Sequence, residues 1–348
     1  MKSIFDLTQE QMIEEFVQLN EKKFRAQQVF EWIYRHHVYQ FDDMNNLSLK
    51  FRETLSQHYS SQLLTIKEKQ ISKDGTRKYL FSLSDGGLIE AVLMNHSYGR
   101  SLCVTSQLGC HMGCTFCASG LLKKQRNLTS GEMVNQVLTV MDDIQDKITH
   151  VVIMGIGEPF DNYEQVMNFI YTINHAKGLA IGARHITLST CGLVKQIKQY
   201  AHEGLQCNLA ISLHAPNDEL RNQLMPINKT YPMNVLRDAI VYYIEKTNRR
   251  VTFEYILLKD VNDQLVHARQ LAHYIRGLNA YVNLIPYNAV DEHGYQQSDR
   301  QRVEAFKNEL LRLKINVTQR KEHGRDIDGA CGQLRAKKVG ESNVRNNR

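Results

Sequence analysis

The sequence predicts an α/β fold centred on an incomplete parallel barrel, and two observations support this. First, from residue 101 onward, short apolar runs typical of strands alternate with amphipathic runs typical of helices. Strand patterns occur near residues 101–106, 149–154, 184–190, 207–213, 250–258 and 281–286, and helical patterns near 130–143, 162–176, 193–203, 233–246, 264–276 and 299–314. Second, six successive strand–helix units imply a parallel sheet with helices outside it, a (β/α)6 barrel short of the usual eight units. Functional residues are then expected just after the strands, at their carboxyl ends.

The region before the barrel begins with helices, which extend to about residue 60. Thr8 and Gln11 have the spacing of a capping box, in which two side chains satisfy backbone N–H groups at the start of a helix. A second amphipathic helix is expected next, with Phe24, Val29, Phe30, Ile33 and Tyr34 on its apolar side. Basic residues flank this helix, which is ordinary for a solvated helical face.

Residues 62–94 have the period of strands, with hairpin turns expected at 73–76 and 84–87. Glu90 lies in the last of these strands, and the pattern alone favours its solvated face. The expected division of the chain is a helical and β-hairpin accessory domain at 1–95, the barrel at 96–320 and a C-terminal tail at 321–348.

Composition and charge restrict the class of protein. The 348 residues include 42% hydrophobic and 23% charged residues, which is ordinary for a globular protein, and no apolar run is long enough to span a bilayer. The chain starts without the apolar core of a signal peptide, so a cytoplasmic protein with no membrane partner is expected. The net charge of +6 permits a polyanionic partner without requiring one. Seven clustered cysteines indicate metal ligands or reactive thiols rather than a disulfide scaffold.

Three cysteines that follow the first barrel strand have the spacing Cys110-x-x-x-Cys114-x-x-Cys117. Three thiolates in so short a loop can hold one face of an iron–sulfur cluster. Since four cysteines usually hold such a cluster, one iron would be open for substrate or cofactor. The alternatives are a zinc site or unrelated buried cysteines. A zinc site needs a fourth ligand, and His111 lies beside Cys110, where closure of the chelate ring would be awkward.

Polar residues also stand at the ends of other predicted strands. They are Gly157 and Glu158 after the second strand, Ser189 in the third, Ser212, Leu213 and His214 at the end of the fourth, and Asn288 after the sixth. A glycine-rich turn alone is weak evidence, and serine or asparagine often only caps a following helix. Four polar strand ends in one barrel favour a binding site more strongly than any one of them.

A further cysteine, Cys331, lies far from the cysteine loop, among small residues near the end of the chain. Small neighbours favour an accessible, reactive thiol, but composition alone does not distinguish it from an inert surface thiol. Cys103, on the first barrel strand, is a candidate partner for Cys331.

Together these motifs resemble the RlmN/Cfr family of radical S-adenosylmethionine (SAM) RNA methyltransferases. The resemblance rests on Cys103, the cysteine loop, and residues 154–159, 212–217 and 326–334, and it extends over about residues 5–338. It implies the partial TIM barrel of the radical SAM core with a C-terminal catalytic loop. Gly329, Cys191 and Ala289 depart from the residues usual in the family, which are Ala, Ser and Pro.

The resemblance implies ligands for two cofactors. Cys110, Cys114 and Cys117 would hold a 4Fe-4S cluster. SAM would contact Gly157, Glu158, Ser189, Ser212, Leu213, His214 and Asn288. Two SAM molecules would be used per turnover, one as methyl donor and one as radical source.

The implied reaction is methylation of adenine C2 in 23S rRNA, at the peptidyl transferase centre, and in tRNA, next to the anticodon. Cys331 would carry the methyl group, and attack by Cys103 would release the RNA and leave a disulfide. Glu90 matches the family's proton acceptor, and this replaces the interpretation of Glu90 as a solvated strand residue. A flavodoxin or ferredoxin would supply electrons, and a monomer is expected.

Two alternatives stay open. A Cfr-type enzyme would methylate adenine C8 with most of the same motifs, although Pro286-Tyr287-Asn288 is more similar to the C2 group. An iron–sulfur module that only binds RNA would leave Cys103 and Cys331 without a role. The candidates for RNA contact are Lys123, Lys124 and Arg126, then Lys22, Lys23 and Arg25, and in the tail Arg335, Lys337 and Lys338.

Overall fold

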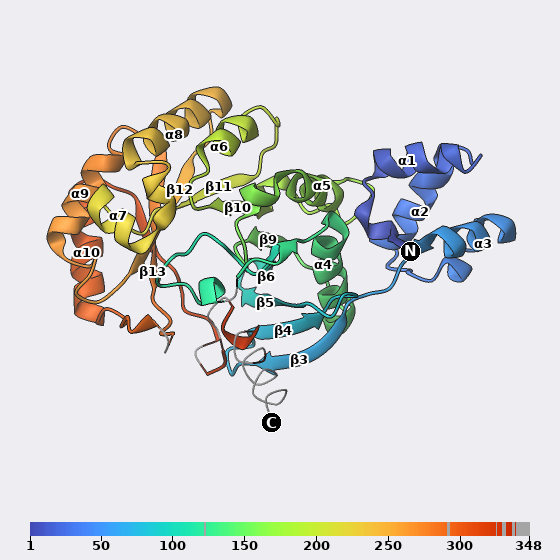
Figure 1. Cartoon of the computed structure of the whole chain (residues 1–348), viewed down its shortest axis with the longest axis horizontal. Helices are drawn as coiled ribbons and strands as arrows, with labels where there is room; N and C mark the ends of the chain where they lie inside the picture. The colour runs from blue at the N-terminus through green and yellow to red at the C-terminus, as the bar shows by residue number, and fades with distance from the viewer. Residues whose placement is uncertain (122, 291–292, 325, 329–331, 336–337, 339–348) are drawn as a thin grey trace.

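A computed structural model describes residues 1–348 apart from 122, 291–292, 325, 329–331, 336–337 and 339–348. Within the described residues, a ten-stranded sheet curves into an open barrel with helices on its outer side (Figure 1). The strand order is β14-β13-β12-β11-β10-β9-β6-β5-β4-β3. From β6 to β14 neighbouring strands are parallel, whereas β3, β4, β5 and β6 pair antiparallel.

The barrel elements alternate as predicted. The parallel strands are β6 (Gly99–Cys103), β9 (His150–Ile153), β10 (Ile186–Thr190), β11 (Asn208–Ser212), β12 (Val251–Leu257), β13 (Ala280–Pro286) and β14 (Val317–Gln319). The helices are α4 (Ser130–Ile144), α5 (Tyr163–Asn174), α6 (Val194–Tyr200), α7 (Asp218–Leu224), α8 (Met233–Thr247), α9 (Leu265–Ile275) and α10 (Arg300–Arg312). Every predicted strand and helix of the barrel is present. The short elements α7 and β14 were not predicted.

The N-terminal helices form a group at one end of the molecule, beside α4 and α5 of the barrel (Figure 1). They are α1 (Gln9–Gln18), α2 (Phe24–Tyr34) and α3 (Leu49–His58), and the short strands β1 (Lys2–Ser3) and β2 (Tyr59–Ser60) pair beside them. The capping box is confirmed, because Gln11 N donates to Thr8 Oγ1 at 3.3 Å and Thr8 N donates to Gln11 Oε1 at 2.9 Å. Asp6 links this group to the barrel by accepting a hydrogen bond from Gly131 N, at 3.0 Å, in the first turn of α4.

Strands β3 (Thr65–Ile71), β4 (Arg77–Ser82) and β5 (Leu88–His96) extend the barrel sheet on the side of β6. Both predicted hairpin turns are present, and Gly75 and Gly86 supply the positive φ angles, 82° and 83°, that such turns need. Glu90 on β5 is only 3% exposed, so the pattern-based assignment to a solvated face was wrong. The face that carries Glu90 is covered by Gly332 and Arg335. They belong to the C-terminal segment, a name used below for the described residues between 326 and 338.

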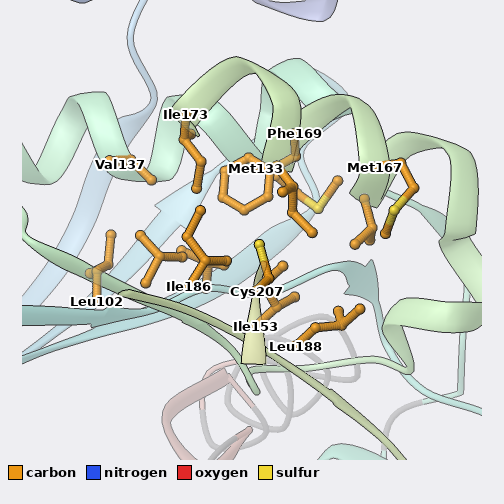
Figure 2. Packing of buried hydrophobic residues seen from close by; sticks show 14 of the residues in the cluster. Leu102, Met133, Val137, Ile153, Met167, Phe169, Ile173, Ile186, Leu188 and Cys207 are labelled. Atoms are coloured by element: carbon orange, nitrogen blue, oxygen red, sulfur yellow. The ribbon is translucent and has the colours of Figure 1, made fainter. Parts of the chain in front are cut away.

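The main hydrophobic core lies between the sheet and its outer helices. Figure 2 shows Met133 and Val137 of α4 and Phe169 of α5 facing the side chains of the strands below them. Leu102 of β6 and Ile186 of β10 are among these strand side chains, and all five residues are fully buried. Across the part of the chain that the structure describes, no helix combines the length and apolarity needed to cross a membrane.

Candidate active site

The carboxyl ends of the parallel strands surround a cavity of about 310 Å³. Its lining includes most of the residues predicted to form the site: Cys103, Cys110, Cys114, Cys117, Gly157, Glu158, Ser189, Ser212, His214 and Asn288. The barrel brings them together because parallel strands all end at the same edge. Leu213 and Glu90 are buried and do not line the cavity. Cys331 lies outside the described residues.

The cysteine loop is closed at its base by a short ladder. Strands β7 (Gln107–Leu108) and β8 (Arg126–Asn127) pair antiparallel on either side of it. Within the loop, Gly113 has a φ of 69°, which favours glycine because other residues rarely adopt it. Thr115 N donates to the carbonyl of Leu224 at 3.0 Å and so ties the middle of the loop to α7. The three thiols are therefore presented by a loop that is held at its base and its middle.

The described residues do not form a preassembled group of three metal ligands, so the fit of the three thiols to an iron–sulfur cluster rests on their donor type and their shared loop. Burial raises the pKa of the Cys110 thiol to about 11 and also raises the pKa of the Cys114 thiol. A negative charge at Cys117 opposes ionisation of both. Metal ions favour the thiolate form, which is the form that ligates them. His111, the ligand considered for a zinc site, has its Nδ1 3.6 Å from an oxygen of Asp161.

Gly157 and Glu158 form the turn after β9. Gly157 has a φ of 108°, and a Cβ atom there would lie 2.6 Å from the Cβ of Gln107. The Glu158 carboxylate accepts hydrogen bonds from Cys191 N at 2.7 Å and from Phe160 N at 3.1 Å. Burial raises the pKa of Glu158, and the Cys191 N–H opposes this by stabilising the carboxylate. The carboxylate thus joins the ends of β9 and β10 at the cavity wall.

The ends of β10 and β11 contribute hydroxyls and a histidine. The hydroxyl oxygens of Ser189 and Ser212 are 3.2 Å apart. His214 has a φ of 55°, an uncommon conformation for a residue with a Cβ atom and one that is often found at functional sites. Burial, followed by the charge of Arg221, lowers the pKa of His214 to about 3, so its ring is neutral at neutral pH. Its Nδ1 accepts a hydrogen bond from Ile256 N at 3.1 Å.

Glu90 and Cys103 lie on neighbouring strands, on the face directed toward the inside of the barrel. Cys103 pairs in register with Val92, two residues from Glu90, and lines the cavity. Glu90 Oε2 accepts a hydrogen bond from Gly332 N at 2.9 Å. A Cβ atom on Gly332 would lie 2.8 Å from the backbone N of Ser119, so this part of the C-terminal segment touches the end of the cysteine loop. Segments distant in the sequence therefore meet at this wall.

Comparisons with known proteins agree with this geometry. Residues 2–60 match the family described as "Ribosomal RNA large subunit methyltransferase N-terminal domain", and residues 104–272 match the radical SAM superfamily. A protein of Spiroplasma citri is 55% identical over 343 residues, covering 98% of this chain and 99% of that protein. One from Enterococcus faecalis is 54% identical over 353 residues, covering 99% of each chain. Both carry the name "Probable dual-specificity RNA methyltransferase RlmN". The chain belongs to the RlmN family.

A solved structure supports the same assignment at the level of the fold. A radical SAM methyltransferase from Sphaerobacter thermophilus superimposes with a TM-score of 0.92 at 40% sequence identity, covering 97% of this chain and 100% of that one. The predicted partial barrel of the radical SAM core is thereby confirmed. Membership of the RlmN family of radical SAM RNA methyltransferases implies a 4Fe-4S cluster, SAM and an RNA substrate. The Cfr-type alternative is not favoured.

In this RlmN-family protein, Arg221 is a site residue that the sequence analysis missed. It is fully buried, and its guanidinium donates to Cys191 O at 2.7 Å, to Asn228 Oδ1 at 2.8 Å and to Leu213 O at 3.3 Å. These acceptors come from the ends of β10 and β11 and from the segment after α7, so Arg221 holds the cavity wall together. Arginine on a short helix is usually solvated, and no local pattern indicated its burial.

The basic residues near the cysteine loop are engaged within the protein. Arg126 pairs with both oxygens of Glu132, at 2.7 and 2.8 Å, and its Nε donates to Asp85 at 2.7 Å. Lys124 Nζ lies 2.5 Å from Asp161 Oδ2. These contacts give Arg126 and Lys124 a structural role at the base of the loop, whereas Lys123 is exposed.

Proposed function

We propose that this chain methylates carbon 2 of adenosine in 23S rRNA and in tRNA through a methyl group carried on Cys331. Carbon 2 is an electron-poor aromatic CH, so it is a poor nucleophile for direct attack on SAM. The observation that supports the proposal is that Cys103 lines the same cavity as Cys110, Cys114 and Cys117. A resolving thiol beside a cluster loop suits a reaction that passes through the protein's own sulfur.

The cavity lining supports an assignment of the cofactor sites. Cys110, Cys114 and Cys117 would hold the 4Fe-4S cluster, and the strand ends with Glu158 and His214 would hold SAM. When bound, the reduced cluster supplies the electron for cleavage of SAM and so the radical chemistry that activates a methyl group. Two SAM molecules are used per turnover, one for the methyl group and one for the radical.

The residues of the chain then have distinct tasks. The Cys331 thiolate accepts a methyl group and later links the activated carbon to adenine C2. Glu90 takes the proton that leaves C2. The odd electron left by radical addition would pass to the cluster. Cys103 then attacks the sulfur of Cys331, the bond from that sulfur to the substrate carbon breaks with its electron pair on the carbon, and a proton from solvent completes the methyl group. The methylated RNA is released and the two cysteines form a disulfide. The enzyme acts as a cytoplasmic monomer that receives electrons from a flavodoxin or ferredoxin.

We assign RNA contact to the accessory region at residues 1–95. The other two parts of the chain are the barrel at 96–320 and the tail at 321–348. Lys22 and Lys23 are exposed at the start of α2. Phe24 is 51% exposed, and the Arg25 guanidinium lies 4.9 Å from the centre of its ring. Exposed aromatic rings and arginine planes are the groups on which unstacked RNA bases stack.

The test is anaerobic reconstitution with iron, sulfide, dithionite, SAM and RNA, followed by mass spectrometry of the nucleosides. The proposal expects 2-methyladenosine together with 5′-deoxyadenosine. Formation of 8-methyladenosine would replace it with the Cfr-type reaction. RNA binding with neither product would indicate a module that only binds RNA.

A further inference from the structure

One face of the β3–β4–β5 extension carries buried polar side chains among apolar ones and receives the C-terminal segment. On β4 and β5, Lys78 pairs with Val92 and Leu80 pairs with Glu90, so Lys78 and Glu90 are diagonal neighbours on the same face. Strand residues alternate between faces, and those on the opposite face, such as Ile89, are packed in the main core. The face with Lys78 and Glu90 continues into the cavity wall through Val92.

Lys78 is fully buried and connects Glu90 to the C-terminal segment. Its Nζ lies 3.0 Å from Glu90 Oε2 and donates to the carbonyl oxygen of Asp328 at 2.5 Å. Glu90 in turn accepts hydrogen bonds from the backbone N–H groups of Gly332 and Arg335. The buried carboxylate therefore has a cation on one side and two backbone donors of the C-terminal segment on the other.

Further polar contacts hold the same segment to the β3–β4 hairpin. Gln70 Nε2 donates to Asp328 Oδ2 and Gln70 Oε1 accepts from Asp328 N, both at 3.1 Å. The Asp326 carboxylate accepts from the Ser72 hydroxyl and from Lys73 N. Another contact is an ion pair of 3.1 Å between Lys338 Nζ and Glu68 Oε2. Of these contacts, the Lys78–Glu90 pair is the most deeply buried.

We propose that Lys78 is a positioning residue that docks the C-terminal segment on the cavity wall through Glu90 and the Asp328 carbonyl. Two buried ions are tolerated when each is paired and hydrogen-bonded, and removing one partner leaves an uncompensated charge. Without Lys78, the Glu90 carboxylate would draw in water and release the Gly332 and Arg335 donors. Docking thus depends on a buried ion pair in addition to the burial of Leu334 of the same segment.

The role of this docking rests on the proposed function, in which Cys331 carries the methyl group. Gly332 follows Cys331 directly in the chain, and it touches Ser119 at the end of the cysteine loop. By chain connectivity, fixing Gly332 limits where the Cys331 thiol can be delivered. Lys78 then acts on methyl transfer to Cys331 by positioning and takes no part in cleavage of SAM.

The test compares Lys78→Met with Lys67→Met in the full-length, cluster-loaded protein. Methionine suits a buried site because it is unbranched and apolar. The control makes the same lysine-to-methionine change at Lys67, which is exposed on the same hairpin. Hydrogen exchange is followed in peptides that cover residues 326–335. Cluster content, uncoupled SAM cleavage and transfer of a labelled methyl group to Cys331 are measured on the same samples.

For Lys78→Met we expect exchange in these peptides to become faster on the order of tenfold, because local opening controls it. Methylation of Cys331 should fall by about the same factor, with cluster content and SAM cleavage unchanged. Lys67→Met should behave as wild type. Unchanged exchange in Lys78→Met would overturn the proposal, and faster exchange with undiminished methylation would overturn the positioning role.

Two controls keep the outcomes separate. If Lys78→Met does not fold, Glu90→Gln decides whether the buried pair docks the segment, because it removes the charge that pairs with Lys78 and keeps the shape of the side chain. Faster exchange in that variant supports docking, and wild-type exchange overturns it. If the wild type puts no label on Cys331, the proposed function fails, and hydrogen exchange still decides whether Lys78 docks the segment.

Discussion

Individual side chains in the cavity wall are held by backbone groups and by each other. His214 is neutral because burial and the charge of Arg221 lower its pKa to about 3, and it accepts a backbone hydrogen bond. Glu158 accepts two backbone N–H groups, and Arg221 donates to carbonyls of two strand ends. At this scale the polar residues fix the shape of the site, and the cysteines remain as the reactive groups.

The cysteine loop leads to a prediction for protein from which the cluster has been removed. Burial raises the pKa of Cys110 to about 11, whereas a free cysteine has a pKa of about 8.5. Only the thiolate reacts with iodoacetamide, so the raised pKa means slow alkylation at neutral pH and a rate that rises until about pH 11. In urea the rate at Cys110 should level off near pH 8.5.

Peptide mass spectrometry after timed alkylation measures this rate at Cys110 alone. Apo protein in its folded state should show the shifted profile, and cluster-loaded protein should be protected at every pH because the sulfur is coordinated. A folded apo protein in which alkylation already levels off near pH 8.5 would contradict the burial of this thiol.

Among the secondary-structure elements, sequence patterns were informative where the elements are long. The barrel strands and helices were predicted from periodicity alone, and the cysteine loop from its spacing. Short elements such as α7 and β14 carry too few residues for a period to be recognised. Glu90 was misplaced by pattern because the segment that covers it lies far away in the chain. Arg221 was missed for the same reason, since its acceptors belong to strand ends.

The turn after β9 gives a prediction that separates close packing from backbone strain. Gly157 and Gly204 both have positive φ, 108° and 67°, so alanine strains both positions. A Cβ at Gly157 would also lie 2.9 Å from Gln107 N, whereas nothing lies within 4 Å of one at Gly204. We expect Gly204→Ala to lower the free energy of unfolding by about 1 kcal/mol. Gly157→Ala should cost about 2–4 kcal/mol, because the turn must move away from the cysteine loop.

Urea unfolding of both variants and equilibrium binding of SAM measure the two effects. Gly157→Ala should also lose SAM binding, because the turn that carries Glu158 is displaced, and Gly204→Ala should bind SAM normally. Equal losses of stability in the two variants would mean that the close approach to Gln107 has no energetic role.

Across the whole molecule, the open side of the barrel is bridged by the chain that leaves β14. Arg320 N donates to Leu284 O of β13 at 2.8 Å, and the Arg320 guanidinium lies 3.7 Å from the sulfur of Met94 on β5. Gly324 N then donates to Asp74 in the β3–β4 turn at 3.1 Å. The antiparallel extension, the barrel and the C-terminal segment therefore form one continuous wall, and Cys103 lies on it.

The last prediction concerns Cys103, which has two possible roles. Packing would involve only its own strand, whereas a resolving role would also involve Cys331 in the tail. If it only packs on β6, Cys103→Ala removes one small side chain and costs about 1–2 kcal/mol of stability. If it is the resolving thiol, methylation of Cys331, radical formation and addition to adenine all proceed, and only release of the RNA fails. The variant should then accumulate as an RNA–protein adduct, linked through Cys331, that survives denaturation.

Denaturing electrophoresis with labelled RNA measures the adduct, and Cys207→Ala is the matched control. Cys207 is fully buried in the main core (Figure 2), so its replacement should cost a similar amount of stability without trapping RNA. The double variant Cys103→Ala/Cys331→Ala should form no adduct, because the carrier of the link is absent. A Cys103→Ala enzyme that turns over normally without trapped RNA would refute the two-cysteine mechanism, and it would do so even if the cluster and SAM sites are assigned correctly.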